Sequence, residues 1–170
     1  THSHWFNAVE TEVYAFSGFM TALVVFLIMR WSQKIHDSNH IIYLIFISYI
    51  IGLATGLHLL NLLTIPFIGL IIYFSIGKLS TKNLILTFIF SLIIFFGIQS
   101  IIIKGLPQLT ASLGLFGLIF LIILWVIATI YSIKSNKTFL SIFLSSVLLI
   151  VIGYSTYFAI FIRSGQNPNI

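Results

Sequence analysis

Long apolar runs separated by short polar stretches dominate the chain. Six runs cover residues 13–30, 41–56, 60–77, 84–103, 113–133 and 139–162. A helix needs about 20 apolar residues to cross the roughly 30 Å hydrocarbon core of a bilayer. The runs lack the strict alternation of barrel strands, and a helix satisfies its own backbone hydrogen bonds in lipid. The pattern therefore predicts an all-α fold, a polytopic bundle of about six transmembrane helices.

The second and third runs are shorter than the others and lie on either side of residues 56–61. They form either one long broken hairpin or two short, tilted spans. We expect a single transmembrane helical domain over residues 1–163, followed by an exit loop at 164–170.

The composition supports a membrane protein. Hydrophobic residues make up 59% of the chain and charged residues 6%, with a mean hydropathy of +1.16, whereas about 25% of a typical soluble domain is charged. These values exclude a soluble enzyme, a nucleic-acid-binding domain and a disordered regulator, so membrane lipid is the first expected partner. The absence of cysteine excludes a disulfide framework and thiolate metal sites.

The basic residues divide unevenly between the two sides of the expected bundle. If all six runs cross, one side carries Arg30, Lys34, Lys78, Lys82, Lys134 and Lys137. The other side carries only Lys104 and Arg163, together with Glu10, Glu12 and His58. Basic residues favour the cytoplasmic side of a membrane, so both termini and the 56–61 turn are predicted to lie outside the cytoplasm.

The first candidate site is a polar stripe on the first helix. Its members recur at helical spacings of three and four: Asn7, Glu10, Tyr14, Ser17 and Thr21. A carboxylate near the apolar boundary is costly unless it is paired or hydrated, which makes Glu10 a functional candidate. The alternative is that Glu10 and Glu12 lie in the headgroup region, with Trp5 as an interfacial anchor. Glu12 points away from the stripe.

The second candidate site is the turn between the second and third runs. His58 and Asn61 share a face if this turn is helical, and Gly52 and Gly56 allow close helix packing. An imidazole at this point can donate to a phosphate or move a proton; alternatively, it caps a broken helix by bonding a free carbonyl. No second ligand stands at a recognised spacing from His58, so we expect no metal site.

The third candidate is Arg163, at the outer end of the last helix, with Lys104 on the same side. A guanidinium binds two oxygens of a phosphate or carboxylate at once. A membrane-edge arginine that extends its charge to water is the alternative.

Three polar strings also resemble a known family. They are residues 5–15 (Trp-Phe-Asn-Ala-Val-Glu, then Glu-Val-Tyr-Ala), residues 51–66 (Ile-Gly-Leu, Gly-Leu-His-Leu-Leu-Asn, Ile-Pro) and residues 153–164 (Gly-Tyr-Ser-Thr-Tyr, Ile-Arg-Ser). In this order they are similar to bacterial multi-pass proteins of "domain of unknown function 2723". That family is grouped with protein O-mannosyltransferase-like enzymes of the GT-C glycosyltransferase superfamily.

The resemblance implies transfer of a sugar from a polyprenyl-phosphate donor to a protein hydroxyl at the extracytoplasmic face of the bacterial cytoplasmic membrane. The implied partners are the lipid-linked sugar and an acceptor protein, and no other cofactor is expected. Glu10 is the candidate catalytic residue. The candidate substrate-binding residues are Asn7, Tyr14, His58, Asn61, Lys104 and Arg163.

One departure from the family concerns the catalytic acid. Members carry an acidic motif in a loop before the Trp-Phe-Asn string, and this chain begins at Thr1. We therefore expect an internal fragment that is inactive alone. The competing hypothesis is a non-enzymatic membrane subunit or a transporter fragment. A transporter favours inverted repeats and polar groups at the midplane, and the sequence contains neither.

Overall fold

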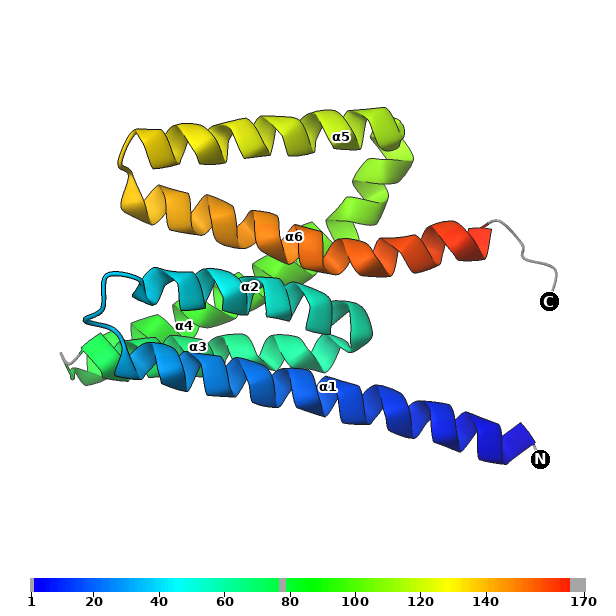
Figure 1. The fold of residues 1–170 in the computed structure, drawn as a ribbon, viewed down its shortest axis with the longest axis horizontal. Helices are drawn as coiled ribbons and strands as arrows, with labels where there is room; N and C mark the ends of the chain where they lie inside the picture. The colour runs from blue at the N-terminus through cyan, green and yellow to red at the C-terminus, as the bar shows by residue number, and fades with distance from the viewer. Residues whose placement is uncertain (1, 77–78, 166–170) are drawn as a thin grey trace. The chain divides into compact units, whose positions relative to one another are not determined.

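The computed structural model describes residues 2–76 and 79–165, with side chains for 14–76, 79–114 and 116–157. All regular structure in these residues is helical (Figure 1). The elements in order are α1 (His2–Gln33), α2 (His40–Leu57), the 3₁₀ helix η1 (Leu59–Leu63), α3 (Thr64–Ile76), α4 (Thr81–Gly97), the π-helical turn η2 (Ile98–Lys104), α5 (Gly105–Lys134) and α6 (Thr138–Gly165).

Six stretches of the described chain are long and apolar enough to cross a membrane, which confirms the predicted helical membrane protein. They are Tyr14–Gln33, His40–Leu57, Leu59–Ile76, Thr81–Gly114, Phe116–Lys134 and Thr138–Tyr157. The second and third runs each reach 18 residues.

The polar stretch between the fourth and fifth apolar runs, residues 104–112, is helical. α5 begins directly after Lys104, and Pro107 stands in its first turn, next to the π-helical turn η2. The backbone breaks instead at Gly114, which has φ 68° and ψ 177°. A residue without a Cβ adopts this conformation at little cost.

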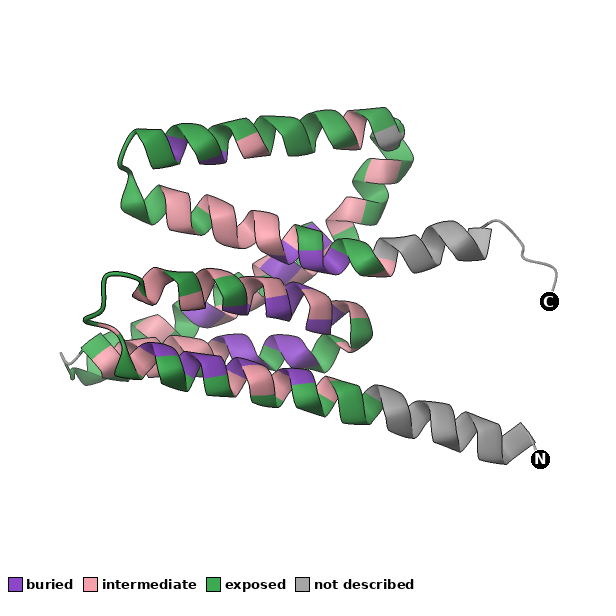
Figure 2. Cartoon of the chain, viewed as in Figure 1, coloured by how far each residue is buried: buried purple, intermediate pink, exposed green. Residues whose placement is uncertain are grey.

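The described chain divides into two compact units. Unit 1 comprises Thr1–Thr64 and Leu149–Ile170, and unit 2 comprises Ile65–Leu148. In unit 1, α1 and α2 lie side by side with the connection 34–39 between them (Figure 1). Apolar side chains of both helices are buried, and Val24, Ile28 and Ala54 are almost fully enclosed (Figure 2).

Glycines set the packing between α2 and the last described turns of α6 in unit 1. A Cβ on Gly52 would collide with the carbonyl oxygen of Ile150, and a Cβ on Gly153 would lie 2.6 Å from the Tyr49 carbonyl oxygen. A Cβ on Gly56 would lie 3.1 Å from the Cβ of Tyr157. The predicted close packing at Gly52 and Gly56 is therefore confirmed, with Gly153 as its counterpart in α6.

In unit 2, α3 to α5 and the first part of α6 leave most of their apolar side chains exposed, among them Phe116 at 88% and Phe139 at 82%. Gly69 of α3 lies against Ser91 of α4, and the Trp125 Nε1 of α5 donates to the Leu144 carbonyl oxygen of α6 at 3.0 Å. Exposed apolar helix faces are expected where lipid replaces water.

Candidate functional site

The described part of the polar stripe on α1 faces the turn between α2 and α3. Ser17 Oγ and Thr21 Oγ1 donate to the side-chain oxygen of Asn61, at 3.2 and 2.7 Å. One turn earlier, the Tyr14 ring lies 5.5 Å from the His58 ring, centroid to centroid. Side chains some 40 positions apart in the sequence are therefore in contact, and the first two of the three candidate sites form one cluster in unit 1.

Asn61 joins the parts of this cluster through the hydrogen bonds of its side chain. Its amide nitrogen donates to the carbonyl oxygens of Ala54 (2.8 Å) and His58 (3.0 Å), while its oxygen accepts from the two hydroxyls of α1. An asparagine side chain offers two donor hydrogens and two acceptor lone pairs, so all four are used. Asn61 is only 3% exposed. The Ala54 and His58 carbonyls each accept a backbone N–H as well, so the Asn61 side chain adds a second bond to both and links them to α1.

His58 interrupts the helical path between α2 and η1 with an extended backbone, φ −153° and ψ 125°. Its Nδ1 accepts a hydrogen bond from the Leu60 N–H at 3.2 Å and so caps η1. The cap differs from the predicted one, because the ring receives an N–H where a bond to a carbonyl was expected. In neutral imidazole an accepting Nδ1 leaves the proton on Nε2. Nε2–H is then a donor, and it has no hydrogen-bond partner among the described residues.

Tyr14 lies at the outer edge of this cluster and is 61% exposed. The stripe on α1 therefore has two parts. Thr21 and Ser17 bond to buried Asn61, whereas Tyr14, beside the His58 ring, is exposed. A ligand that approached this end of unit 1 would meet an aromatic hydroxyl and an imidazole N–H.

The remaining candidates belong to unit 2 or lie outside the described side chains. The side chains of Asn7, Glu10, Glu12 and Arg163 lie outside the described set, although α1 and α6 include their backbone. Lys104 is exposed at the end of η2 and belongs to unit 2, whereas His58 belongs to unit 1. The predicted substrate pocket of His58, Lys104 and Arg163 stays a prediction, as do the roles assigned to Asn7, Tyr14 and Asn61.

Sequence reasoning did not find the bond between Asn61 and the Ala54 carbonyl. The available signal was a polar residue five positions before a proline, in the turn that follows the end of a helix. Spacing identified Ser17 and Thr21 as one face of α1 but did not identify Asn61 as what that face bonds to.

A comparison with known protein families finds a match for the N-terminal part of the chain. The model of the "Protein O-mannosyl-transferase TMEM260 N-terminal domain" matches residues 1–83. This stretch resembles an O-mannosyltransferase domain. It contains the stripe of α1 and the whole His58–Asn61 turn. No curated protein and no solved structure matches the chain.

The match supports an O-mannosyltransferase-like family. The narrower resemblance to the bacterial "domain of unknown function 2723" proteins, and a bacterial cytoplasmic membrane as location, stay predictions. The six apolar helices make the chain a membrane protein.

Proposed function

We propose that this chain is part of an integral-membrane protein O-mannosyltransferase-like enzyme. It binds a polyprenyl-phosphate-linked sugar, and the complete enzyme transfers that sugar to a protein hydroxyl on the extracytoplasmic face. The observation that carries the proposal is the His58 ring, whose cap to Leu60 leaves an Nε2–H donor at the open edge of the cluster. The ring lies within the stretch that the O-mannosyltransferase model matches.

The chemistry of sugar transfer from a lipid phosphate fits this arrangement. The departing phosphate needs donors that stabilise its charge, and the acceptor hydroxyl needs a base. His58 and Arg163, both of unit 1, are proposed to hold the phosphate. Glu10 stands four positions before Tyr14 on α1 and is proposed to face the same open edge. The acidic loop expected upstream would supply the main catalytic base.

Donor binding tests the proposal without requiring turnover. Affinity for a polyprenyl-phosphate mannose is measured on the purified chain in detergent micelles. His58→Asn keeps a side-chain acceptor for the Leu60 N–H but removes the Nε2–H, and we expect about tenfold weaker binding, the value of one hydrogen bond to a charged group. Arg163→Lys should also weaken binding, because lysine cannot reproduce the two-oxygen contact.

Matched controls separate a binding role from a structural one. His36→Asn changes a histidine in the α1–α2 connection and is the control for His58→Asn. Glu12→Gln changes the glutamate that points away from the stripe and is the control for Glu10→Gln. Both control variants should bind the donor like wild type. Wild-type affinity in His58→Asn and Arg163→Lys would reduce these residues to a helix cap and a membrane anchor. Absence of donor binding in the wild-type chain would favour the non-enzymatic membrane subunit.

The proposed orientation has its own test, because the chain contains no cysteine and single cysteines can be labelled cleanly. A membrane-impermeant maleimide applied from outside the cell should label Ser112→Cys and miss Ser135→Cys. Both positions are exposed at the two ends of α5. Ser135 is a better site than its neighbour Asn136, whose φ of 54° disfavours most residues. Labelling of Ser135→Cys alone would reverse the orientation.

A further inference from the structure

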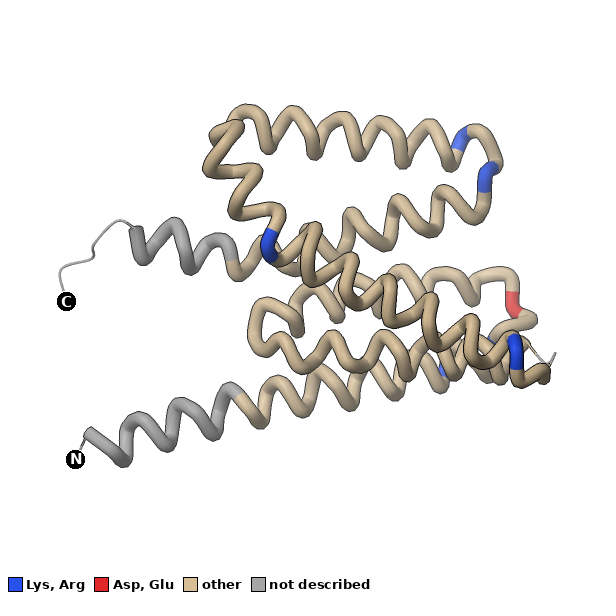
Figure 3. The backbone as a smooth tube through the Cα atoms, turned by 180° about the vertical axis from the view of Figure 1, so that it is seen from behind, with Lys and Arg blue, Asp and Glu red and all other residues tan. Residues whose placement is uncertain are grey.

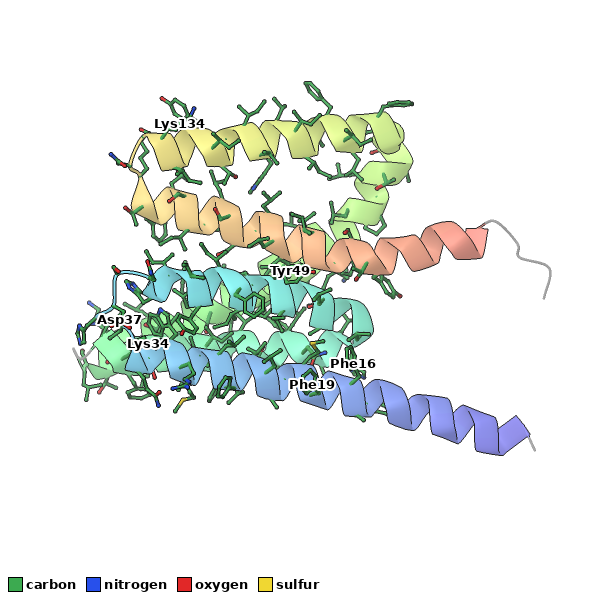
Figure 4. All side chains as sticks on the ribbon, viewed as in Figure 1. Phe16, Phe19, Lys34, Asp37, Tyr49 and Lys134 are labelled. Atoms are coloured by element: carbon green, nitrogen blue, oxygen red, sulfur yellow. The ribbon has the colours of Figure 1, made fainter. Side chains whose placement is uncertain are left out.

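The connection between α1 and α2 forms a pocket at the opposite end of these helices from the Tyr14–His58 contact. Its volume is about 510 Å³, within the range of small-molecule sites. Six of its lining residues matter here: Lys34, Asp37, Ser38, His40, Ile42 and Tyr43. Figure 4 labels Lys34 and Asp37 on this connection. All of them belong to unit 1.

The pocket contains two opposite charges that do not neutralise each other. The Lys34 ammonium lies 5.8 Å from the centroid of the Tyr43 ring, which holds it by a cation–π contact. Asp37 supplies the carboxylate, and in the described part of the chain no ion pair joins it to Lys34. Asp37 is the single acidic residue among the described side chains, and the connection between α1 and α2 carries the red segment in Figure 3. A ligand with one negative and one positive group would complement this pair.

Neutral polar groups add directional bonds beside the charges. The Nδ1–H of His40 donates to the Asp37 carbonyl oxygen at 2.8 Å. This bond orients the ring and leaves Nε2 without a described partner. The Ser38 hydroxyl is exposed in the same wall. Among the described residues, neither the Lys34 ammonium nor the Asp37 carboxylate has a hydrogen-bond partner.

An apolar surface continues from the pocket along α2. Ile42 lines the pocket and is 62% exposed, and Phe46, one turn further, is 46% exposed. The connection joins the candidate spans Tyr14–Gln33 and His40–Leu57, so it lies at a membrane surface. A ligand that carries a charged head and apolar chains would fit both the pocket and this helix face.

We propose that the pocket binds the headgroup of a membrane phospholipid that carries both a phosphate and a primary ammonium, as phosphatidylethanolamine does. Lys34 and Ser38 hold the phosphate, Asp37 accepts hydrogen bonds from the ammonium, and the acyl chains lie along Ile42 and Phe46. The site is separate from the proposed sugar-transfer site and does not depend on it. Basic pockets between membrane helices are established binding places for lipid headgroups.

Native mass spectrometry of the purified full chain tests the proposal with three lipids of equal chain length. We expect phosphatidylethanolamine to bind about fivefold more tightly than phosphatidylcholine, whose quaternary ammonium cannot donate to Asp37, and more tightly than phosphatidylglycerol, which has no ammonium. Asp37→Asn should remove the preference for ethanolamine over choline. Lys34→Gln should weaken the binding of the ethanolamine lipid and of the choline lipid by about fivefold each, as expected for one basic residue near a lipid surface.

The control Lys134→Gln removes the same charge from the α5–α6 connection and should leave all three affinities unchanged. Equal binding of ethanolamine and choline lipids by wild type, or a preference retained in Asp37→Asn, would overturn the proposal. Binding of phosphatidylglycerol more tightly than phosphatidylethanolamine would show that the site recognises only the negative charge of the lipid, and would also overturn the proposal. Glycerophosphoethanolamine, which has no acyl chains, should compete poorly. If it binds as tightly as the lipid, the ligand is a soluble metabolite and the lipid assignment is wrong.

Discussion

Among the described residues, unit 1 joins its elements through bonds between two side chains, whereas the side-chain bonds of unit 2 all go to the backbone. In unit 1, Ser17 and Thr21 of α1 bond to Asn61, which in turn bonds to the end of α2. In unit 2, the hydroxyls of Ser91 and Thr129 return to carbonyls of their own helices. A hydroxyl that bonds to its own helix satisfies itself without selecting a neighbour. A bond between elements, by contrast, selects one arrangement.

The glycines of the two units also differ in what they contact. In unit 1, Gly52 and Gly153 bring the backbones of α2 and α6 into direct contact. In unit 2, Gly69 approaches side chains, those of Ser91 and Thr87, and nothing lies within 4 Å of a Cβ built on Gly97 or Gly114. The contacts within unit 1 thus specify its packing, whereas unit 2 presents apolar helix faces such as those of Phe116 and Phe139. The region with the more specific packing also contains the candidate site.

The largest expected effect is at the α2–α6 backbone contact. In Gly153→Val the new Cβ would meet the Tyr49 carbonyl oxygen at 2.6 Å and the Leu53 nitrogen at 2.7 Å, and backbone cannot move aside as a side chain can. We expect a loss of about 3 kcal/mol in the free energy of unfolding, measured in detergent micelles. Gly18→Val is the matched control, because nothing lies within 4 Å of a Cβ there. Equal stability of the two variants would show that the glycine contact does not hold unit 1 together.

The next largest effect is expected at Asn61. Asn61→Ala removes four hydrogen bonds and leaves the Ala54 carbonyl without its side-chain donor. At roughly 0.6 kcal/mol for each bond in a membrane protein, the loss is about 2 kcal/mol. Asn83→Ala, at an exposed position in the first turn of α4, should change stability little. A loss as small as that of the control would mean that the cluster between α1 and the turn does not contribute to stability.

The sequence predicted most of the helical pattern because each span needs only a long apolar run. It also placed Ser17, Thr21 and Tyr14 on one face, since helical periodicity alone determines that. Two features depended on information that a linear pattern does not contain. One is the helix at 105–113, which continues through Gln108, Thr110 and Ser112, polar residues between the fourth and fifth apolar runs.

The second feature is the tautomer of His58. Its capping role followed from the position between two apolar runs, but the identity of the bonded atom depends on the extended backbone at His58 and the position of the Leu60 N–H. The same holds for the pocket at the α1–α2 connection. Lys34 was interpreted only as a topology signal and Asp37 was given no role, because the pocket that they line depends on how the connection folds.

A smaller effect is expected at the glycine contact of unit 2. In Gly69→Ala the new Cβ would lie 2.9 Å from the Ser91 Cβ and 3.3 Å from its hydroxyl. A side chain can shift more easily than backbone, so we expect a loss of about 1 kcal/mol in the free energy of unfolding, well below that of Gly153→Val. Ser91→Gly should restore stability in the double variant by removing the colliding atoms. A loss as large as that at Gly153 would remove the contrast between the two units.

The smallest expected effect, and the only gain, is at Ser132 of α5. Its hydroxyl is one of two buried side-chain polar atoms without a hydrogen-bond partner among the described residues; the other is the Trp31 Nε1. Ser132→Ala removes an unsatisfied group and replaces serine by a better helix former, so the free energy of unfolding should rise by about 0.5–1 kcal/mol. Ser91→Ala is the matched comparison, because that buried hydroxyl donates to the Phe88 carbonyl oxygen at 2.8 Å and its loss should bring no such gain. Destabilisation by Ser132→Ala would mean that the hydroxyl has a partner in the folded membrane protein, as the Trp125 Nε1 of the same unit has in the Leu144 carbonyl oxygen.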